Sequence, residues 1–494
     1  MGVKGHRRPR GRWLVAVAIV ALLPSAGAVG ATSSVALVSA AGVTPAPLDG
    51  VPQVLAPVDP ATGTGPAAAG LGAALTELLK PGLVGNARGI AVVDVATGAL
   101  LFGQEGERGI TPASTTKVLT AAAVLAALGP DAQLHTRVQR ISEGATAGPQ
   151  TAPPATPAVS PGAPAPPQPP AQIVLVGGGD PLLSSLPAGS PKLPDYPRRA
   201  SLVDLAGQTA ADLTAAGVRQ VQLRYDASVF SGPAASPNWE RSYTGDVVGP
   251  VMGLSADQGR LGPLDGGRLD DPALHTARLF AAELQRRGLH VLGAPTAGIA
   301  PAGSETIADV ASAPMSAVIE HMLVESDNDV AEALVRQVAI ARGKPGTFVD
   351  GAAAALAELT ALGVDVTGVS LHDGSGLSRD DRIPPQVIAH TLALAAAGPR
   401  TELRPLVAGL SIAGVNGTLG QRFTTSSALP ARGVLRGKSG YLTGVVALSG
   451  VILDASGRMI AFDVAADAVP PGSGIAVRTN WDRVAGVLAR CGCA

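Results

Sequence analysis

The chain has 494 residues, with 37 Lys and Arg against 38 Asp and Glu and a formal net charge of −1. That length is enough for two or three domains, and the balanced charge gives no electrostatic case for a nucleic-acid partner. The sequence contains no H-E-x-x-H string and no cysteine–histidine cluster, so we expect neither a catalytic metal nor a cofactor.

Residues 1–30 have the layout of a secretory signal. Basic residues precede an almost wholly apolar run, Trp13–Leu23, and Ala26-Gly-Ala28 offers small residues for cleavage. Because moderately apolar residues continue to Gly42, an uncleaved membrane anchor, and with it membrane association, remains an alternative. In both cases we expect an exported, extracytoplasmic protein of the cell envelope. Residues 31–74, rich in Pro, Gly and Ala, predict a flexible linker.

The folded body begins with a predicted hairpin and then a helix that carries the first chemical motif, Ser114-Thr-Thr-Lys117. Residues three apart share a helix face, so the Lys117 amine is expected beside the Ser114 hydroxyl. A desolvated amine can be the base that a serine nucleophile needs. Serine and lysine at this spacing are also common capping and surface residues. The helix is so apolar over Val118–Leu125 that it must be buried, and a buried lysine without a function is costly, which favours catalysis.

The stretch between this helix and the second motif is too long for one helical lobe. We therefore predict an inserted α/β region at residues 136–305, with a disordered Pro-rich loop at 144–172 inside it. Its expected elements are a strand at Gln172–Val176, a helix at Leu202–Ala215, a strand at Val221–Tyr225 and a helix at Ala273–Arg287.

The second motif, Ser326-Asp327-Asn328, lies between two predicted helices, Ser316–Glu325 and Asp329–Arg342. A turn there can project Ser326 and Asn328 into a cleft. Ser326 could then relay a proton to a leaving amine, and Asn328 could donate to a substrate amide or to Lys117. As an isolated string, S-D-N is more often a helix N-cap or a turn.

The third motif, Lys438-Ser439-Gly440, lies in a predicted β-meander that a C-terminal helix, Arg478–Arg490, would cover. An edge strand here can run antiparallel to a peptide substrate. Lys438 would supply positive charge and Ser439 a hydroxyl for a carboxylate, while Gly440 allows close approach of the backbone. An ordinary solvated strand end is the alternative interpretation of this string.

The three motifs in this order, S-x-x-K, S-D-N and K-T-G, are the signature of serine enzymes that are acylated by penicillins or acyl-D-alanine substrates. Longer segments extend the match, namely Gly177–Pro181, Val324–Leu334, Asp373–Arg382 and Gly414–Leu419. On these residues the chain resembles the low-molecular-mass class C penicillin-binding proteins, the D-alanyl-D-alanine carboxypeptidase/endopeptidase family.

The resemblance implies a role for each site residue. Ser114 would be the acylated nucleophile and Lys117 its general base. Ser326 and Asn328 would complete the proton relay, and Lys438 and Ser439 would hold the substrate carboxylate. The backbone N–H groups of Ser114 and Tyr441 would form the oxyanion hole. The residue after the Lys438-Ser439-Gly440 glycine is usually small or hydroxylic in this family. Tyr441 keeps the backbone donor but puts a hydroxyl contact to the substrate carboxylate in doubt.

The expected fold is of the α/β (α+β) class, with a transpeptidase domain like that of penicillin-binding proteins and β-lactamases. It would combine residues 75–135 and 306–494 in an antiparallel sheet with helices on both faces and a helical lobe, interrupted by the inserted region. The resemblance implies the same insertion.

We therefore expect an exported serine-type D-Ala-D-Ala carboxypeptidase, with DD-endopeptidase action suggested by the resemblance, whose partners are peptidoglycan peptides and β-lactams. A β-lactamase or esterase on the same fold is the alternative. Fast hydrolysis of β-lactams needs a base for deacylation, which in one class of β-lactamases is a glutamate with its bound water. No segment of this chain resembles the loop that carries that glutamate, although Glu325 and Glu332 lie near the second motif. A non-catalytic envelope scaffold is a third hypothesis, which the presence of all three motifs disfavours. Whether Cys491 and Cys493 pair with each other, pair between chains or stay free is left open.

Overall fold

The computed structural model describes residues 68–141, 170–263 and 267–491. The predicted signal or anchor, most of the predicted linker, nearly all of the Pro-rich loop, and Cys493 lie outside the described residues. Among the described residues, no helix combines the length and the apolar character that a membrane span requires.

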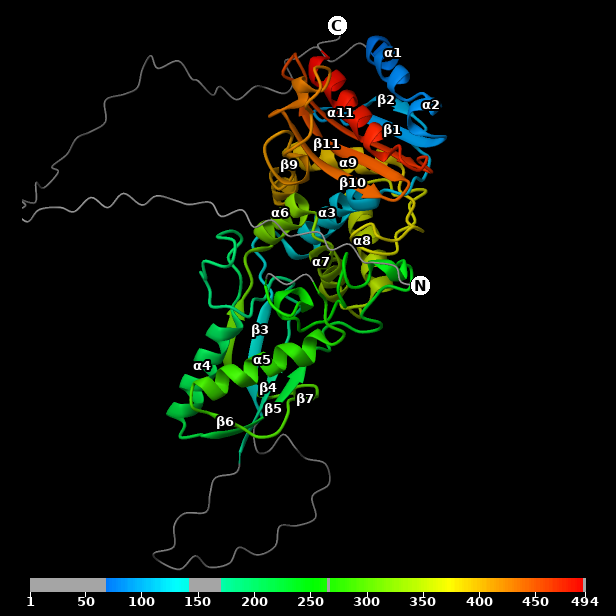
Figure 1. The fold of residues 1–494 in the computed structure, drawn as a ribbon. Helices are drawn as coiled ribbons and strands as arrows, with labels where there is room; N and C mark the ends of the chain where they lie inside the picture. Colours follow the sequence, from blue (N-terminus) through cyan, green and yellow to red (C-terminus); the bar gives the residue numbers. More distant parts are fainter. Residues whose placement is uncertain (1–67, 142–169, 264–266, 492–494) are drawn as a thin grey trace, which may run out of the picture. The chain divides into compact units, whose positions relative to one another are not determined.

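The first of two sheets is built from both ends of the folded chain, in the order β2-β1-β12-β11-β10-β9 (Figure 1). All of its neighbouring strands are antiparallel. The strands are β1 (Ala87–Asp94), β2 (Leu100–Gln104), β9 (Ser411–Ile412), β10 (Leu435–Leu442), β11 (Val445–Leu453) and β12 (Met459–Asp467). Strands β11 and β12 are buried along almost their whole length, which requires that both faces of the sheet be covered.

Helices cover both faces of this sheet. On one face α1 (Ala68–Leu78), the short α2 (Pro81–Val84) and α11 (Gly474–Arg490) enclose a core that includes Phe462 and Trp481. The Trp481 indole N–H donates to the carbonyl oxygen of Val446 on β11 at 3.0 Å, so this buried polar group is satisfied. On the other face α9 (Pro385–Ala396) packs against β1 and β12.

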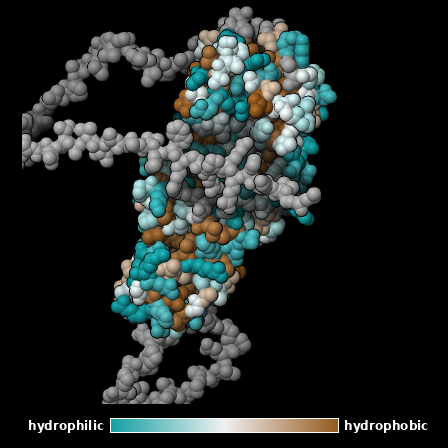
Figure 2. All heavy atoms as spheres, in the orientation of Figure 1, coloured by the Kyte–Doolittle hydropathy of each residue, from teal (hydrophilic) through white to brown (hydrophobic). Residues whose placement is uncertain are grey.

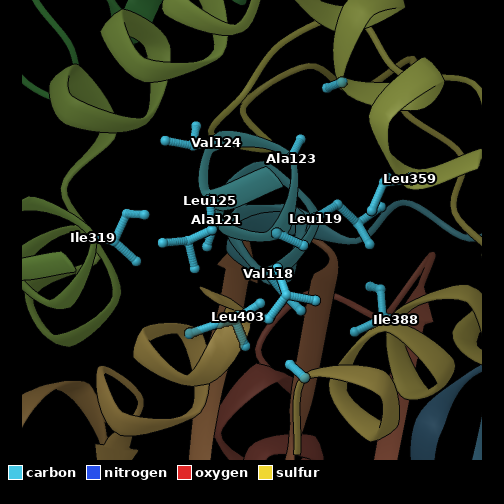
Figure 3. Close-up of a cluster of buried hydrophobic side chains, with 14 of the residues drawn as sticks. Val118, Leu119, Ala121, Ala123, Val124, Leu125, Ile319, Leu359, Ile388 and Leu403 are labelled. Atoms are coloured by element: carbon cyan, nitrogen blue, oxygen red, sulfur yellow. The ribbon is translucent and has the colours of Figure 1, made fainter. Parts of the chain in front are cut away.

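The apolar helix that carries Lys117 of the first motif, α3 (Thr116–Leu128), is the centre of the helical lobe. Its neighbours are α6 (Met315–Glu325), α7 (Asn328–Ala341), α8 (Phe348–Ala361), α9 and α10 (Arg404–Ala408). Figure 3 shows α3 ringed by side chains of these neighbours, among them Ile319, Leu359 and Ile388. Every residue of α3 from 116 to 125 is buried, as the sequence predicts.

The second sheet lies in the predicted inserted region and has the order β6-β5-β4-β3-β8, with β7 paired to β5. Its strands are β3 (His135–Arg140), β4 (Ala171–Val176), β5 (Gln220–Asp226), β6 (His290–Val291), β7 (Thr296–Ala297) and β8 (Glu305–Ala311), and its helices are α4 (Leu202–Ala215) and α5 (Pro272–Arg286). Strands β4 and β5 are parallel and α4 connects them, whereas β3 is antiparallel to both β4 and β8.

The mixed helix-and-sheet fold class is confirmed. The limits of the inserted region stay a prediction, and β8 belongs to the second sheet up to Ala311. On the face of the molecule in Figure 2, hydrophilic and hydrophobic residues are interspersed over the described surface.

Candidate active site

The first motif begins one turn before α3. Ser114 lies in a 3-10 turn, Ala113–Thr115, and not in the α-helix itself. Ala113 has φ 49°, in the left-handed region that non-glycine residues rarely occupy. Two glycines allow other segments to pack closely against this turn. A Cβ on Gly440 would lie 2.6 Å from the carbonyl oxygen of Pro112, and a Cβ on Gly376 would lie 1.9 Å from the carbonyl oxygen of Ala113. Strained backbone of this kind persists only where its surroundings impose it.

The Lys117 amine is fully buried and meets three oxygen atoms. Its Nζ lies 3.0 Å from Ser114 Oγ, 2.7 Å from Asn328 Oδ1 and 2.8 Å from the carbonyl oxygen of Ser375. Burial lowers the pKa of Lys117 to about 8. A neutral amine has two N–H groups and one lone pair. Since the two carbonyl-type oxygens can accept both N–H groups, the lone pair is left facing the serine hydroxyl.

The second motif forms a turn between α6 and α7. Ser326 is in the left-handed region with φ 58°, and the Asp327 carboxylate caps α7 by accepting the N–H of Val330 at 3.1 Å. Asn328 is the first residue of α7, and its Nδ2 donates to the carbonyl oxygen of Val247 at 3.0 Å. That contact turns its Oδ1 toward Lys117. The N-cap interpretation therefore describes Asp327, whereas Ser326 and Asn328 reach the two lysines of the site.

Lys438 makes the second lysine–serine pair. Its amine is buried and donates to Ser326 Oγ at 2.8 Å and to the carbonyl oxygen of Ser439 at 2.9 Å. Burial, together with the charges of Lys117 and Arg422, lowers the pKa of Lys438 well below its usual value. The structure thus forms two hydrogen-bonded groups, Ser114–Lys117–Asn328 and Ser326–Lys438, and the two lysines lie close enough to repel.

Strand β10 carries the third motif at the edge of the sheet. Strand β9 pairs only with Arg436 and Gly437, so within the described chain no strand covers that side of β10 from Lys438 onward. Ser439 Oγ donates to Thr418 Oγ1 at 2.9 Å. Tyr441 is 60% exposed, and its side chain is in neither of the two hydrogen-bonded groups.

Several groups at the site have no role in the sequence analysis. Thr418 lies in a 3-10 turn, Gly417–Leu419, and faces Ser439. The carbonyl of Ser375 contacts Lys117, and Glu332 and Asp373 bind the backbone on either side of it. The match over Asp373–Arg382 singled out this segment but attached no chemistry to it. Backbone carbonyls carry no residue-type signal, so only the fold reveals them.

Within the described ranges, no three His, Cys, Asp or Glu side chains are grouped so that they could hold a metal ion. A cavity of about 620 Å³ lies away from the motifs and is lined by residues of the β1–β2 turn, of the segment after α8 and of α9. A second cavity, of about 460 Å³, is lined in part by Ser326, Asp327 and Asn328 of the second motif. The candidate site is the place where the hydrogen bonds of the three motifs meet.

Comparison with known proteins gives consistent matches. The model of the D-Ala-D-Ala carboxypeptidase 3 (S13) family matches residues 71–263 and 266–488. Carboxypeptidase DacB of Mycolicibacterium smegmatis is 35% identical over 453 residues, which cover 91% of this chain and 90% of the relative. The D-alanyl-D-alanine carboxypeptidase of an Actinomadura species is 29% identical over 458 residues, 78% of this chain and 80% of the relative.

Among solved structures, penicillin-binding protein 4 of Haemophilus influenzae has a TM-score of 0.66 with this chain at 19% identity. The match covers 83% of this chain and 97% of that protein. At this identity the likeness concerns the fold.

Proposed function

Because the chain belongs to the S13 family of D-Ala-D-Ala carboxypeptidases, we propose that it hydrolyses the terminal D-Ala-D-Ala bond of peptidoglycan stem peptides through an acyl-enzyme on Ser114. The predicted family and the class of enzyme, a serine-type D-Ala-D-Ala carboxypeptidase, are confirmed. The roles of individual residues are the proposal.

The contact that carries the proposal is the 3.0 Å hydrogen bond between Ser114 Oγ and Lys117 Nζ. Lys117 takes the hydroxyl proton while Oγ bonds to the carbonyl carbon of the penultimate D-alanine. The C–N bond then breaks, and Ser326 passes a proton to the departing amine and is reprotonated through the lysines, of which Lys438 lies 2.8 Å from its Oγ. Water next attacks the ester, and release of the stem peptide returns the proton to Ser114.

The edge of β10 would hold the substrate. An extended peptide can hydrogen-bond to the uncovered side of this strand, with its carbonyl oxygen between the N–H groups of Ser114 and Tyr441. The terminal carboxylate would lie near Lys438 and the paired hydroxyls of Ser439 and Thr418, which are 2.9 Å apart. Thr418 thereby offers a second hydroxyl at a site where Tyr441 contributes only backbone.

Two further parts of the proposal rest on the family. A penicillin would acylate Ser114 as a substrate does, and cross-links that end in D-alanyl bonds are candidate substrates beside pentapeptides. Since peptidoglycan lies outside the cytoplasm, the protein would act there, either secreted or anchored by its N-terminal segment.

The test is labelling of purified protein with a fluorescent penicillin, together with assay of D-alanine release from a pentapeptide that ends in D-Ala-D-Ala. Wild type should be labelled and should release D-alanine, and Ser114→Ala should do neither. Ser304→Ala is the matched control, because Ser304 is a half-buried serine whose Oγ bonds the carbonyl oxygen of Pro301 in the inserted region. Labelling of Ser114→Ala at the wild-type level would refute the proposal.

A further inference from the structure

The turn Asp373–Ser378 carries the backbone carbonyl that binds the Lys117 amine. The carbonyl oxygen of Ser375 lies 2.8 Å from Lys117 Nζ and occupies one of the two N–H groups of the neutral base, while Asn328 occupies the other. If this carbonyl moved, the amine could rotate and its lone pair would no longer face Ser114. The position of the turn is therefore part of the geometry of proton transfer.

A buried glutamate of α7 holds the first half of the turn. Both carboxylate oxygens of Glu332 accept the N–H of Gly374, at 3.2 and 3.1 Å, and Oε1 also accepts the N–H of Ser375 at 2.7 Å. Glu332 has no exposed surface. The peptide groups on either side of the Gly374 Cα are thus bound to one side chain of the helix that begins at Asn328.

Asp373 holds the second half of the turn. Its Oδ1 accepts the N–H of Gly376 at 2.7 Å, and its Oδ2 accepts the N–H of Ser378 at 2.7 Å and the indole N–H of Trp239 at 2.8 Å. A carboxylate that receives three N–H donors is favoured in its charged form. Thr120 of α3 donates to the carbonyl oxygen of Gly374 at 2.6 Å, which ties the turn to the helix of Lys117.

A third carboxyl, Asp381, is buried close to Asp373. Its Oδ1 accepts the N–H of His372 at 2.8 Å. Burial raises the pKa of Asp381 well above its usual value, and the neighbouring charge of Asp373 raises it further. Asp381 is therefore favoured in its protonated form, since like charges this close do not readily ionise together.

We propose that Glu332 and Asp373 are positioning residues for the acylation step: they hold the Ser375 carbonyl against Lys117 so that the lone pair of the amine faces Ser114, and the charge of Asp373 offsets that of the lysine. The inference rests on the proposed function, because it assigns these groups to the same base. Neither side chain touches the substrate, and both act through the turn.

Charged groups face Lys117 from each element packed around it. The S-D-N turn and α7 contribute Asp327, Asp329 and Glu332, the Asp373–Ser378 turn contributes Asp373, and β10 contributes Lys438. Burial lowers the pKa of Lys117, while the carboxylates, Glu332 first and Asp373 second, raise it again. Removing a carboxylate must therefore lower the pKa of Lys117 and move the acidic limb of the acylation rate to lower pH.

The first arm of the test measures that limb. In Asp373→Asn alone, Asp381 can ionise in place of Asp373, so the informative protein is D373N/D381N. The acidic limb of its rate of acylation by benzylpenicillin should move to lower pH by roughly one unit. The rate that it reaches on the plateau at high pH should fall about tenfold or more. Asp373→Glu keeps the charge but not the geometry, so its plateau should fall while its limb stays at the wild-type pH.

The second arm tests position through the plateau rate, which does not depend on the pKa of Lys117. Glu332→Gln places an amide NH₂ against the N–H of Gly374 even when its amide oxygen keeps the Oε1 position that accepts from Ser375, so its plateau should also fall about tenfold or more. The matched controls are Glu358→Gln, a buried glutamate of α8 that binds Arg342, and Asp226→Asn. Asp226 likewise holds two backbone N–H groups, those of Ser228 and Ala300, in the second sheet.

The controls should keep both the limb and the plateau of wild type. A limb at the wild-type pH in D373N/D381N, or a plateau in Glu332→Gln that equals that of Glu358→Gln, overturns the inference. If D373N/D381N does not fold, as thermal melting would show, the plateau of Glu332→Gln decides. Failure of wild type itself to be acylated would instead count against the proposed function.

Discussion

At the scale of single residues, the two buried lysines set the chemistry. Lys117 and Lys438 each lie within 3.0 Å of a serine hydroxyl, at Ser114 and Ser326 respectively. A fully buried ammonium is costly, and two that repel each other are costlier still. The same burial that penalises their charge makes a neutral amine available near neutral pH, which a solvated lysine does not offer.

The first prediction at this scale concerns the pH dependence of wild-type acylation. Lys117 must be neutral to accept the Ser114 proton, and burial lowers its pKa to about 8. The second-order rate of acylation by benzylpenicillin should therefore rise about tenfold per pH unit well below that value and level off above it. Stopped-flow measurement between about pH 5.5 and 9.5 checks this, with buffers of constant ionic strength.

A rate that stays flat across that range, or that falls with rising pH from the acid side, would contradict the assignment of Lys117 as the base. The denaturation profile of the unreacted protein over the same range is the control, since it separates titration of the base from loss of fold.

At the scale of elements, the turn Ala113–Thr115, which carries the proposed nucleophile Ser114, depends on close contact between segments that are distant in sequence. Gly376 has φ 80°, and an added Cβ would lie 1.9 Å from the carbonyl oxygen of Ala113. Gly376→Ala should therefore combine a left-handed penalty with steric overlap and lower the free energy of unfolding by about 3 kcal/mol. It should also slow acylation, because the turn that must move carries Ser114.

Gly343→Ala is the matched control for this substitution. Gly343 has φ 68°, and an added Cβ would meet nothing within 4 Å, so only the left-handed penalty of about 1 kcal/mol applies. Urea unfolding of both variants and of wild type gives the comparison. Equal losses in the two variants would show that the contact between Gly376 and Ala113 is not tight.

Most regular elements were predictable because their patterns are local. The helix predicted at Leu202–Ala215 has those bounds in the structure, and the strand predicted at Gln172–Val176 differs from β4 by one residue. The 3-10 turn at Ser114 was not predicted, since it depends on contacts with Gly376 and Gly440 that no periodicity reveals.

The candidate site divides in the same way. Motif spacing located the serines and lysines, because each side chain is chemically distinctive. The carbonyl of Ser375 and the carboxylates that hold it were missed, since Glu332 and Asp373 are far apart in the sequence and act on backbone groups. The N-cap role of Asp327 was recognised only as the alternative interpretation of its motif.

At the scale of the whole molecule, α7 joins the catalytic motifs to the inserted region. The Asp329 carboxylate accepts the N–H of Gly249 at 2.8 Å, and Gln337 donates to the carbonyl oxygen of Gly178 at 2.8 Å. Arg336 donates to the carbonyl oxygen of Val251 at 3.1 Å. The helix that supplies Asn328 to Lys117 is thus held by loops of the inserted region, so an insertion far from the nucleophile in sequence contributes to the placement of the site.

The fate of the acyl-enzyme distinguishes a carboxypeptidase of this family from a β-lactamase on the same fold. A lactamase needs a base that activates water against the acyl ester. The two glutamates near the second motif do not serve: Glu332 is occupied by the N–H groups of Gly374 and Ser375, and Glu325 is exposed at the end of α6. We therefore expect a benzylpenicillin adduct on Ser114 that persists for minutes, seen as a single mass increment by intact-protein mass spectrometry.

Nitrocefin turnover at many cycles per second would show the lactamase instead, and absence of any adduct while muropeptides still bind would show the scaffold. A persistent adduct accompanied by D-alanine release from pentapeptide fits only the carboxypeptidase, because the peptide ester must then be hydrolysed while the penicilloyl ester stays shielded.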